Sequence, residues 1–352
     1  MKKYFFAAFS LFLLCSSAYA LNEKLFYLTN DDKNFIQQFD LHHRSIDILG
    51  PQVYELDKNG NIGGHLDPAM LEAANRHHVK VMPLVINTHF DQNLLHAFLQ
   101  SLSAQRRSIA TMLALCDKYH LYGLQFDIEN ISTNDKNEFT HYFITAADTL
   151  HQHGYAVSIA VVPRNDSLPI ETPYESWIYD NWTGAYDYEI LAKHSDFISL
   201  MTYDRHTTLT TPGPVAPYEW VEKTLQELLR KIPATKLSLG IPVYSGYWTT
   251  GIIPIGDKIQ GLSKFSFRSR EKQIGYDKLS ELMNQFRKPL IWDNEAKSSY
   301  LMHSNKGLYE YIFAENARSF KARIELAKKY HLRGVSVWKM GLEDPKIWDG
   351  LS

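Results

Sequence analysis

Short apolar runs alternate with amphipathic segments along most of the chain, and this pattern predicts an α/β fold. Strands are predicted at residues 25–28, 46–49, 79–86, 122–130, 157–162, 197–201, 237–243 and 335–338. Helices are predicted at about 67–78, 103–119, 135–153, 188–194, 221–231 and 317–330, one before each of the last six strands. Strands that alternate with helices pair in parallel, and eight such units favour a closed (β/α)8 TIM barrel. The alternative, an open doubly wound sheet, is less favoured because no glycine-rich phosphate turn follows the first strand.

Two segments interrupt this alternation. Residues 163–182 have no clear pattern and predict a long loop, whose aromatic side chains are Tyr174, Trp177, Tyr179 and Trp182. Between strands 7 and 8, short strands are predicted at 289–293, 299–303 and 307–313, with a turn at 305–307. We therefore expect a small, mostly antiparallel α+β insertion at about residues 250–314.

The N-terminus predicts a cleaved signal peptide over residues 1–20. Lys2 and Lys3 precede an apolar run, residues 4–15, that is too short to span a bilayer of about 30 Å. Ala18-Tyr19-Ala20 then provides a small-residue cleavage site. We expect residues 21–352 to form one exported domain, periplasmic or secreted, without a membrane segment; an uncleaved anchor is the alternative.

The amino-acid composition limits which kinds of partner and cofactor this domain is expected to bind. Hydrophobic residues are 45% and charged residues 22%, which is typical of a globular protein, and the net charge of −2 argues against binding nucleic acid. Only Cys116 remains after cleavage, so no internal disulfide can form, and we expect this thiol to be buried in a helix. The 15 histidines lack ligand spacing, so no metal and no cofactor are predicted. A monomer is expected.

The fourth predicted strand, YGLQFDIEN at residues 122–130, carries an unusual polar stripe. Gln125, Asp127 and Glu129 share one face and would point into the barrel, toward its C-terminal mouth. Burying unpaired carboxylates costs several kcal/mol per charge, so the stripe needs a reason. One possible reason is structural: the three side chains could form a hydrogen-bonded polar layer inside the barrel. The other is a coupled acid pair, in which Glu129 donates a proton while Asp127 tunes and orients it.

The same stretch resembles the signature of glycoside hydrolase family 18, D-G-x-D-x-D-x-E. Gly123, Asp127 and Glu129 match it at the right spacing, and residues 201–204 (MTYD) resemble the M-x-Y-D after the sixth strand. Trp338 ends the eighth strand, where the family has a sugar-stacking tryptophan, and the family also has the small insertion. The resemblance spans roughly residues 24–350 and is strongest to the branch of spore-cortex peptidoglycan hydrolases and N-acetylglucosaminidases.

This resemblance implies an exported, retaining hydrolase that cleaves β-1,4 bonds beside N-acetylglucosamine in peptidoglycan or chitin. Glu129 would protonate the glycosidic oxygen, and the substrate's own 2-acetamido oxygen would be the nucleophile. Asp127 would stabilise the acetamido group and Tyr203 would hold its carbonyl. Trp338 would form the floor under the reacting sugar, and Met201 and Asp204 would line the pocket. The alternative is a non-catalytic, chitinase-like carbohydrate-binding protein, although such proteins usually lose the terminal Glu.

Two positions depart from the signature. Tyr122 replaces its first Asp and Gln125 replaces its second. Glutamine forms hydrogen bonds but cannot ionise, so we expect Gln125 to brace Asp127 from below, within the substrate site, and Asp127 to titrate more simply. The aromatic side chains of residues 163–182 could stack on sugars or merely anchor their loop.

Overall fold

The computed structural model describes residues 23–29, 35–164, 169–251 and 269–351, so the predicted signal peptide lies outside the described residues. Its central element is a sheet of parallel strands. These are β1 (Glu23–Thr29), β2 (Ile48–Leu56), β5 (Leu84–Asn87), β6 (Gly123–Asp127), β7 (Ala156–Val161), β8 (Phe197–Leu200), β9 (Leu237–Pro242) and β15 (Gly334–Trp338). Two short strands, β3 (Ile62–Gly63) and β4 (Lys80–Val81), also pair with β2.

The parallel strands close into a barrel. Their order is β1-β15-β9-β8-β7-β6-β5-β2, and β1 pairs with β2 to complete the ring. This closure excludes an open sheet and confirms the predicted (β/α)8 TIM barrel for the described residues.

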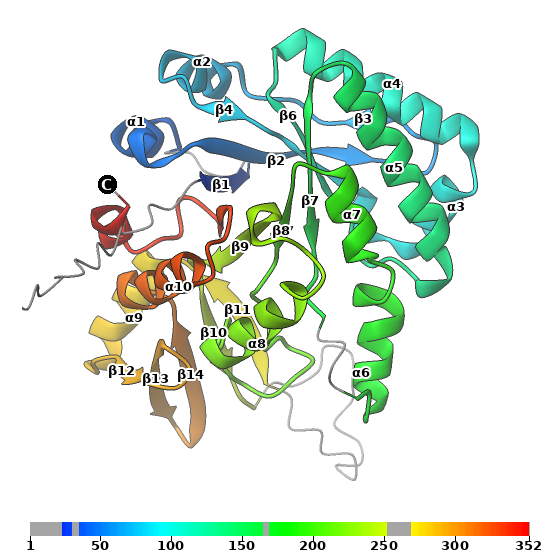
Figure 1. Ribbon diagram of the computed structural model, residues 1–352. Helices are drawn as coiled ribbons and strands as arrows, with labels where there is room; N and C mark the ends of the chain where they lie inside the picture. The colour runs from blue at the N-terminus through cyan, green and yellow to red at the C-terminus, as the bar shows by residue number, and fades with distance from the viewer. Residues whose placement is uncertain (1–22, 30–34, 165–168, 252–268, 352) are drawn as a thin grey trace, which may run out of the picture.

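Helices surround the barrel and connect its strands (Figure 1). They are α1 (Phe35–His42), α2 (Pro68–Arg76), α3 (Gln92–Leu99), α4 (Leu102–Tyr119), α5 (Lys136–Gln152), α7 (Tyr188–His194), α8 (Tyr218–Leu228) and α10 (Ala317–Lys329). The apolar positions of β6 face outward as expected, because Phe126 packs edge-on against Phe143 of α5. Cys116 is buried in α4, as predicted. None of the helices in the described ranges is long and apolar enough to cross a membrane.

Two predicted strands have different limits in the structure. The second strand was expected to end before Gly50-Pro51, but β2 continues to Leu56 because its parallel pairing with β1 continues through Pro51. The predicted strand 79–86 is split into β4 and β5 around Pro83, a residue that has no N–H to donate to a neighbouring strand. The two errors are opposite: Pro51 was taken as the end of a strand that continues through it, and Pro83 was placed inside a strand that it interrupts.

The segment after β7 was predicted to be an unpatterned loop, and this prediction was wrong. It contains α6 (Pro173–Ile178), followed by a π-helical turn at Tyr179–Thr183. Thr172 and Glu175 form a reciprocal capping box, and Pro173 occupies the first turn. This T-P-x-E start signal is readable in the sequence, but the helix is too short to show periodicity.

The predicted insertion between strands 7 and 8 is confirmed: its described residues, 245–251 and 269–314, form a second, antiparallel sheet with one helix. Its elements are β10 (Ser245–Thr249), β11 (Arg270–Ile274), α9 (Tyr276–Phe286), β12 (Ile291–Asp293), β13 (Ser298–Asn305) and β14 (Leu308–Ala314), and the strand order is β11-β10-β14-β13-β12. The predicted turn is present, with φ of 50° at Lys306 and 83° at Gly307. The sheet begins at Ser245, before the expected start.

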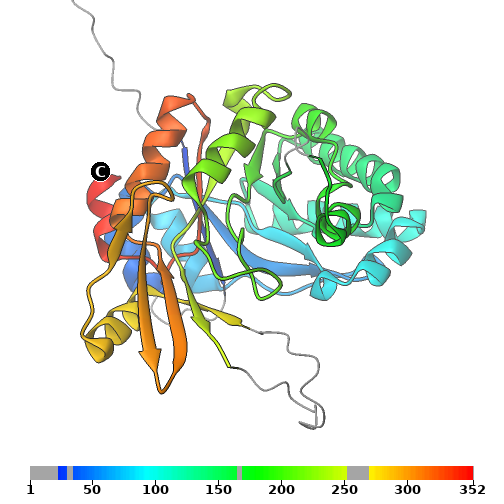
Figure 2. The ribbon, with the colours of Figure 1, turned by 90° about the horizontal axis from the view of Figure 1, so that it is seen from below.

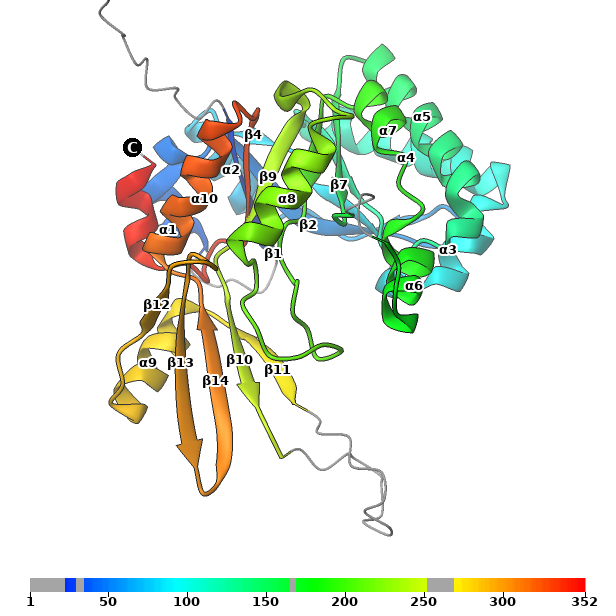
Figure 3. The ribbon, with the colours of Figure 1, turned by 60° about the horizontal axis from the view of Figure 1, so that its bottom comes forward.

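The insertion and α6 both project from the same end of the barrel (Figures 2 and 3). A buried charge links the insertion to the barrel. Arg323 of α10 is 0% exposed, lies 3.6 Å from Glu315, and donates to the carbonyl of Lys297 at 2.6 Å. It also donates to the carbonyl of Ala216, which precedes α8. Because a buried guanidinium needs partners, this contact ties the two parts together.

Candidate active site

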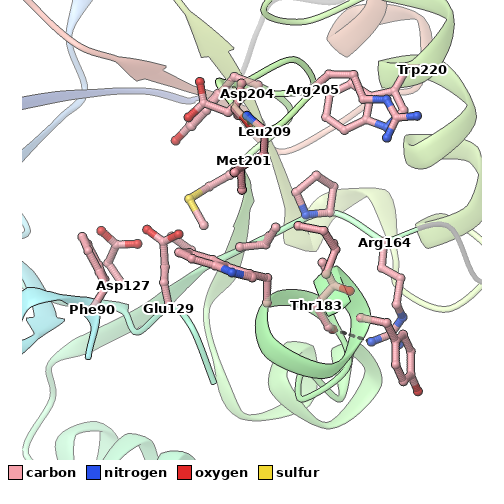
Figure 4. Close-up of a pocket in the computed structure, with 18 of the residues that line it drawn as sticks. Phe90, Asp127, Glu129, Arg164, Thr183, Met201, Asp204, Arg205, Leu209 and Trp220 are labelled. Atoms are coloured by element: carbon pink, nitrogen blue, oxygen red, sulfur yellow. Dashed lines mark hydrogen bonds between the residues drawn. The ribbon is translucent and has the colours of Figure 1, made fainter. Parts of the chain in front are cut away.

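The C-terminal ends of the barrel strands surround a cavity of about 870 Å³, a volume typical of ligand sites (Figure 4). Asp127 is the last residue of β6, and Glu129 follows two residues later. Residues 201–204 follow β8, and Trp338 ends β15. Six of the seven site residues predicted from the sequence line this cavity: Asp127, Glu129, Met201, Tyr203, Asp204 and Trp338.

Gln125 is the seventh, and the structure places it beneath the cavity rather than in its lining. It is fully buried, and its amide nitrogen donates to the hydroxyls of Ser158 at 2.8 Å and Ser199 at 3.0 Å. Ser199 in turn bonds Ser336 at 2.9 Å. The expected brace to Asp127 is absent from the described hydrogen bonds, because residues two apart on a strand are roughly 7 Å apart while neighbouring strands are closer. Gln125 therefore belongs to an interior polar layer.

Asp127 is held by a residue that the sequence analysis missed. The amide of Gln52 on β2 donates to Asp127 Oδ2 at 3.1 Å, and Asp127 is only 3% exposed. The other oxygen, Oδ1, has no hydrogen-bond partner among the described residues. Gln52 escaped notice because the predicted strand ended at Leu49; with β2 extended to Leu56, it becomes a polar residue inside the barrel mouth.

Asn87, at the end of β5, positions Glu129 through its backbone. The Asn87 side-chain amide donates to the Glu129 carbonyl at 3.0 Å and accepts from the Glu129 N–H at 3.0 Å. Tyr186 donates to the preceding carbonyl, Ile128, at 2.8 Å. These bonds fix the main chain around Glu129. The signal for Asn87 in the sequence was a single amide closing the apolar run LVIN.

Burial is the main electrostatic influence on both carboxyl groups. It raises the pKa of Glu129 well above its usual range, and the nearby charges of Asp127 and Asp204 raise it further. Burial also raises the pKa of Asp127, but the hydrogen bond from Gln52 opposes this rise. For Glu129, burial therefore contributes more to the raised pKa than the charge of Asp127 does. Glu129 is thus favoured as the proton holder.

Asp204 receives support from the insertion. The residue is exposed to the cleft, yet Oδ1 accepts a hydrogen bond from buried Tyr244, and a second from Gln273 of β11 at 3.4 Å. The protein atoms that surround the carboxyl group partly desolvate it and raise the pKa of Asp204, and the Tyr244 bond opposes this rise. The insertion therefore contributes directly to one wall of the site.

Two aromatic residues complete the floor of the site. Tyr203 packs edge-on against Tyr244, with ring centroids 6.4 Å apart, and burial raises the pKa of Tyr203, so its hydroxyl stays protonated and can donate. Trp338 is half-buried and lies 5.4 Å from the ring of Tyr27. Its flat face is suited to contact a sugar ring.

The segment around α6 forms another wall of the same cavity. Tyr174 and Trp177 are 38% and 44% exposed, and their rings stack with centroids 6.5 Å apart. Tyr179 differs, because the guanidinium of Arg164 lies over its ring and donates to the carbonyl of Thr183 at 2.5 Å. Tyr179 therefore anchors the segment, whereas Tyr174 and Trp177 present open faces to the cavity. Figure 4 places Arg205, Leu209 and Trp220 in the same cavity.

Chemically, the site combines a carboxyl group that favours protonation with a second carboxylate beside it, on a fixed main chain. Such a pair can donate a proton to a leaving group and later accept one from water. Among the described residues, no cluster of three or more His, Cys, Asp and Glu side chains has the arrangement of a metal site.

Comparisons with known proteins agree on one family. The family model described as "Glycosyl hydrolases family 18" matches residues 26–343. A glycosylase of Bacillus subtilis named YvbX, itself uncharacterised, is 23% identical over 331 residues, covering 92% of this chain and 89% of that protein. The cortical fragment-lytic enzyme of the same organism is 23% identical over 304 residues, covering 85% of this chain and 66% of that enzyme.

Solved structures show the same fold. The spore cortex-lytic enzyme SleL of Bacillus megaterium superimposes with a TM-score of 0.80 at 21% identity, covering 94% of this chain and 73% of that one. A chitinase from Chromobacterium violaceum gives a TM-score of 0.79 at 21% identity, covering 94% and 98%. At such low identity these structures establish the architecture and do not fix the substrate.

Proposed function

Because the chain belongs to glycosyl hydrolase family 18, we propose that it cleaves β-1,4 bonds beside N-acetylglucosamine with retention of configuration, by substrate-assisted catalysis. The observation that carries the proposal is the carboxyl pair at the barrel mouth. Glu129 is buried enough to hold a proton, while Asp127 beside it is stabilised as a carboxylate by Gln52.

In the first step, Glu129 protonates the glycosidic oxygen as the C–O bond breaks. The acetamido oxygen of the same sugar attacks the anomeric carbon and forms a cyclic oxazolinium ion. Asp127 accepts a hydrogen bond from the acetamido N–H and stabilises the positive charge. In the second step, the Glu129 carboxylate takes a proton from water, which attacks the anomeric carbon and reopens the ring. Two inversions give net retention.

Four further residues would complete the site around the sugar. Tyr203 donates to the acetamido carbonyl, which aligns the nucleophile, and Trp338 supports the ring from below. Asp204 lies near Glu129, and its charge raises the pKa of Glu129, which favours the protonated form of the acid. Met201, which lies between Asp204 and Glu129 in Figure 4, supplies an apolar contact.

The polymer is proposed to be peptidoglycan or chitin. The relatives named as cortical fragment-lytic and spore cortex-lytic enzymes support the first, and the chitinases support the second. Product analysis on purified peptidoglycan and on chitin hexamer distinguishes them. Export is proposed from residues 1–20, and a mature N-terminus at Leu21, read by mass spectrometry, is the expected result.

Replacing Glu129 with Gln tests the mechanism. The variant should hydrolyse a chromogenic N-acetylglucosamine oligomer roughly 10²–10⁴-fold more slowly, because the proton donor is lost. Glu138→Gln, the same change at an exposed position on α5, is the control and should retain full activity. If Glu129→Gln hydrolyses the oligomer as fast as wild type, Glu129 is not the general acid. Turnover of a cellulose oligomer, which lacks the acetamido group, would remove the substrate-assisted mechanism.

The alternative function, carbohydrate binding without hydrolysis, predicts a different result. The wild-type protein would then bind N-acetylglucosamine oligomers without cleaving any of them. The presence of Glu129 in the acid position argues against this alternative.

A further inference from the structure

We propose that Gln52 is the positioning residue for Asp127: from β2, it holds the Asp127 carboxylate ionised and oriented, so that the shared proton stays on Glu129. This inference rests on the proposed function of the carboxyl pair. It assigns to β2, which is separated from β6 by β5, the brace that the sequence pattern placed on β6 itself.

The first argument is geometric. Gln52 pairs with Leu84 of β5, and Leu84 pairs with Gln125 of β6, so these three residues lie at one level around the barrel. Asp127 lies one step higher, and the Gln52 amide reaches up to its Oδ2 at 3.1 Å. The register of β2 against β5 shifts between Gln52 and Tyr54, and such bulges re-aim side chains next to active sites.

The second argument is that Gln125 cannot supply this bond. A glutamine side chain has one NH₂ group with two hydrogens, and its oxygen can only accept. The NH₂ of Gln125 donates to Ser158 and to Ser199, so both hydrogens are used. Its remaining atom, Oε1, would repel a carboxylate. Among the described residues, Gln125, which stands where the family signature has its second aspartate, therefore hydrogen-bonds only within the interior polar layer. Gln52 provides the N–H donor to Asp127 instead.

The third argument concerns charge. Within the described part of the chain, the titratable groups that interact electrostatically with Asp127 are Glu129 and three tyrosines: Tyr27 on β1, Tyr203 after β8 and Tyr186 before α7. None of these side chains is cationic. A neutral N–H donor such as Gln52 stabilises the carboxylate form of Asp127 without adding a charge that would also pull the proton from Glu129. The hydrogen bond accordingly lowers the pKa of Asp127 against the effect of burial.

The direct test is a titration that needs no turnover. Carbon-13 NMR of aspartate-labelled protein, with Asp127 assigned by Asp127→Asn, reports the titration of this carboxyl group in wild type and in Gln52→Leu. Removing the donor should raise the apparent pKa of Asp127 by about one pH unit, the size expected for one hydrogen bond to a charged group. Ser158→Ala, which disturbs Gln125 but leaves Gln52 in place, is the control and should not move it.

Kinetics provide the second readout. Because Asp127 must be ionised, the acid limb of the kcat/KM profile should move to higher pH in Gln52→Leu by the same amount, with the basic limb unmoved. A merely structural or substrate-contacting Gln52 would lower the rate at every pH without moving the limb. Gln52→Asn, which keeps the amide but withdraws it by one carbon, replaces Gln52→Leu if that variant does not fold.

The outcomes separate the two proposals. An unchanged Asp127 titration in a folded Gln52 variant overturns the positioning role, whatever the activity. Failure of wild type to cleave any N-acetylglucosamine polymer overturns the proposed function, while the NMR titration still decides whether Gln52 controls Asp127.

Discussion

At the scale of single residues, the site is built from groups that are costly to bury. Glu129 is half-buried and its charged form is penalised first by desolvation and then by Asp127 and Asp204. Asn87 holds the main chain of Glu129 in place and does not contact its carboxyl group, since both hydrogen bonds of Asn87 go to backbone atoms of Glu129. The result is a carboxyl group in a rigid place with a high affinity for a proton.

This arrangement predicts a pH-dependent stability cost. The pKa of Glu129 is raised in the folded state, so its contribution to stability is fully present below the unfolded pKa, near 4.3, and is lost as pH rises through the folded value. Glu129→Gln, which cannot ionise, should therefore melt at a higher temperature than wild type in alkaline buffer, and the difference should shrink toward pH 4. Thermal melts across the pH range, with Glu138→Gln as the control, measure this. A constant difference at all pH values would contradict it.

At the scale of elements, α6 is the part of the site with open aromatic faces. Tyr174 and Trp177 lie three residues apart, on one side of a short helix, and line the same cavity as the carboxyl pair. The capping box at Thr172 and the Arg164 contacts to Thr183 and Tyr179 hold this segment in place without using those two faces. An extended glycan leaving the reacting centre would meet them.

Trp177→Ala should therefore weaken the binding of long substrates more than short ones. We expect KM for an N-acetylglucosamine hexamer to rise roughly tenfold, the effect of losing about 1.4 kcal/mol of contact, with little change for a dimer analogue. Steady-state kinetics on the two substrates measure the difference. Tyr309→Ala removes an exposed aromatic side chain from the insertion, away from the cavity lining, and should change neither value. Equal losses on both substrates would show that Trp177 acts only through local structure.

At the scale of the whole molecule, one buried ion pair connects the barrel and the insertion. Arg323 and Glu315 are 0% and 3% exposed at the side chain, and Arg323 also bonds carbonyl groups of the insertion and of the segment before α8. The link matters for the site because β11 of the insertion provides Gln273 to Asp204.

Arg323→Met should lower the free energy of unfolding by about 3–5 kcal/mol, because it leaves Glu315 buried without its counter-charge. Urea unfolding measures this loss. Lys321→Met, an exposed position on the same helix, is the matched control and should change the value by less than about 0.5 kcal/mol. A loss as small as that of the control would mean that the buried pair does not hold the two parts together.

The sequence by itself determined the barrel and most of the candidate site. Eight strands that alternate with helices bury their apolar faces when the strands close into a barrel. The alternation of side chains along β6 then placed Asp127 at the barrel mouth and Phe126 against α5. Short elements without full periods were missed, among them α6 and β11.

Only the tertiary structure decided how the polar stripe is divided. Gln125, Asp127 and Glu129 share a face in the sequence pattern, but their partners come from other strands: serines of β7 and β8 for Gln125, Gln52 of β2 for Asp127, and Asn87 of β5 for Glu129. Local sequence sets the direction of a side chain because the backbone repeats. It cannot set the partner, because hydrogen bonds and burial depend on residues that meet only when the barrel closes.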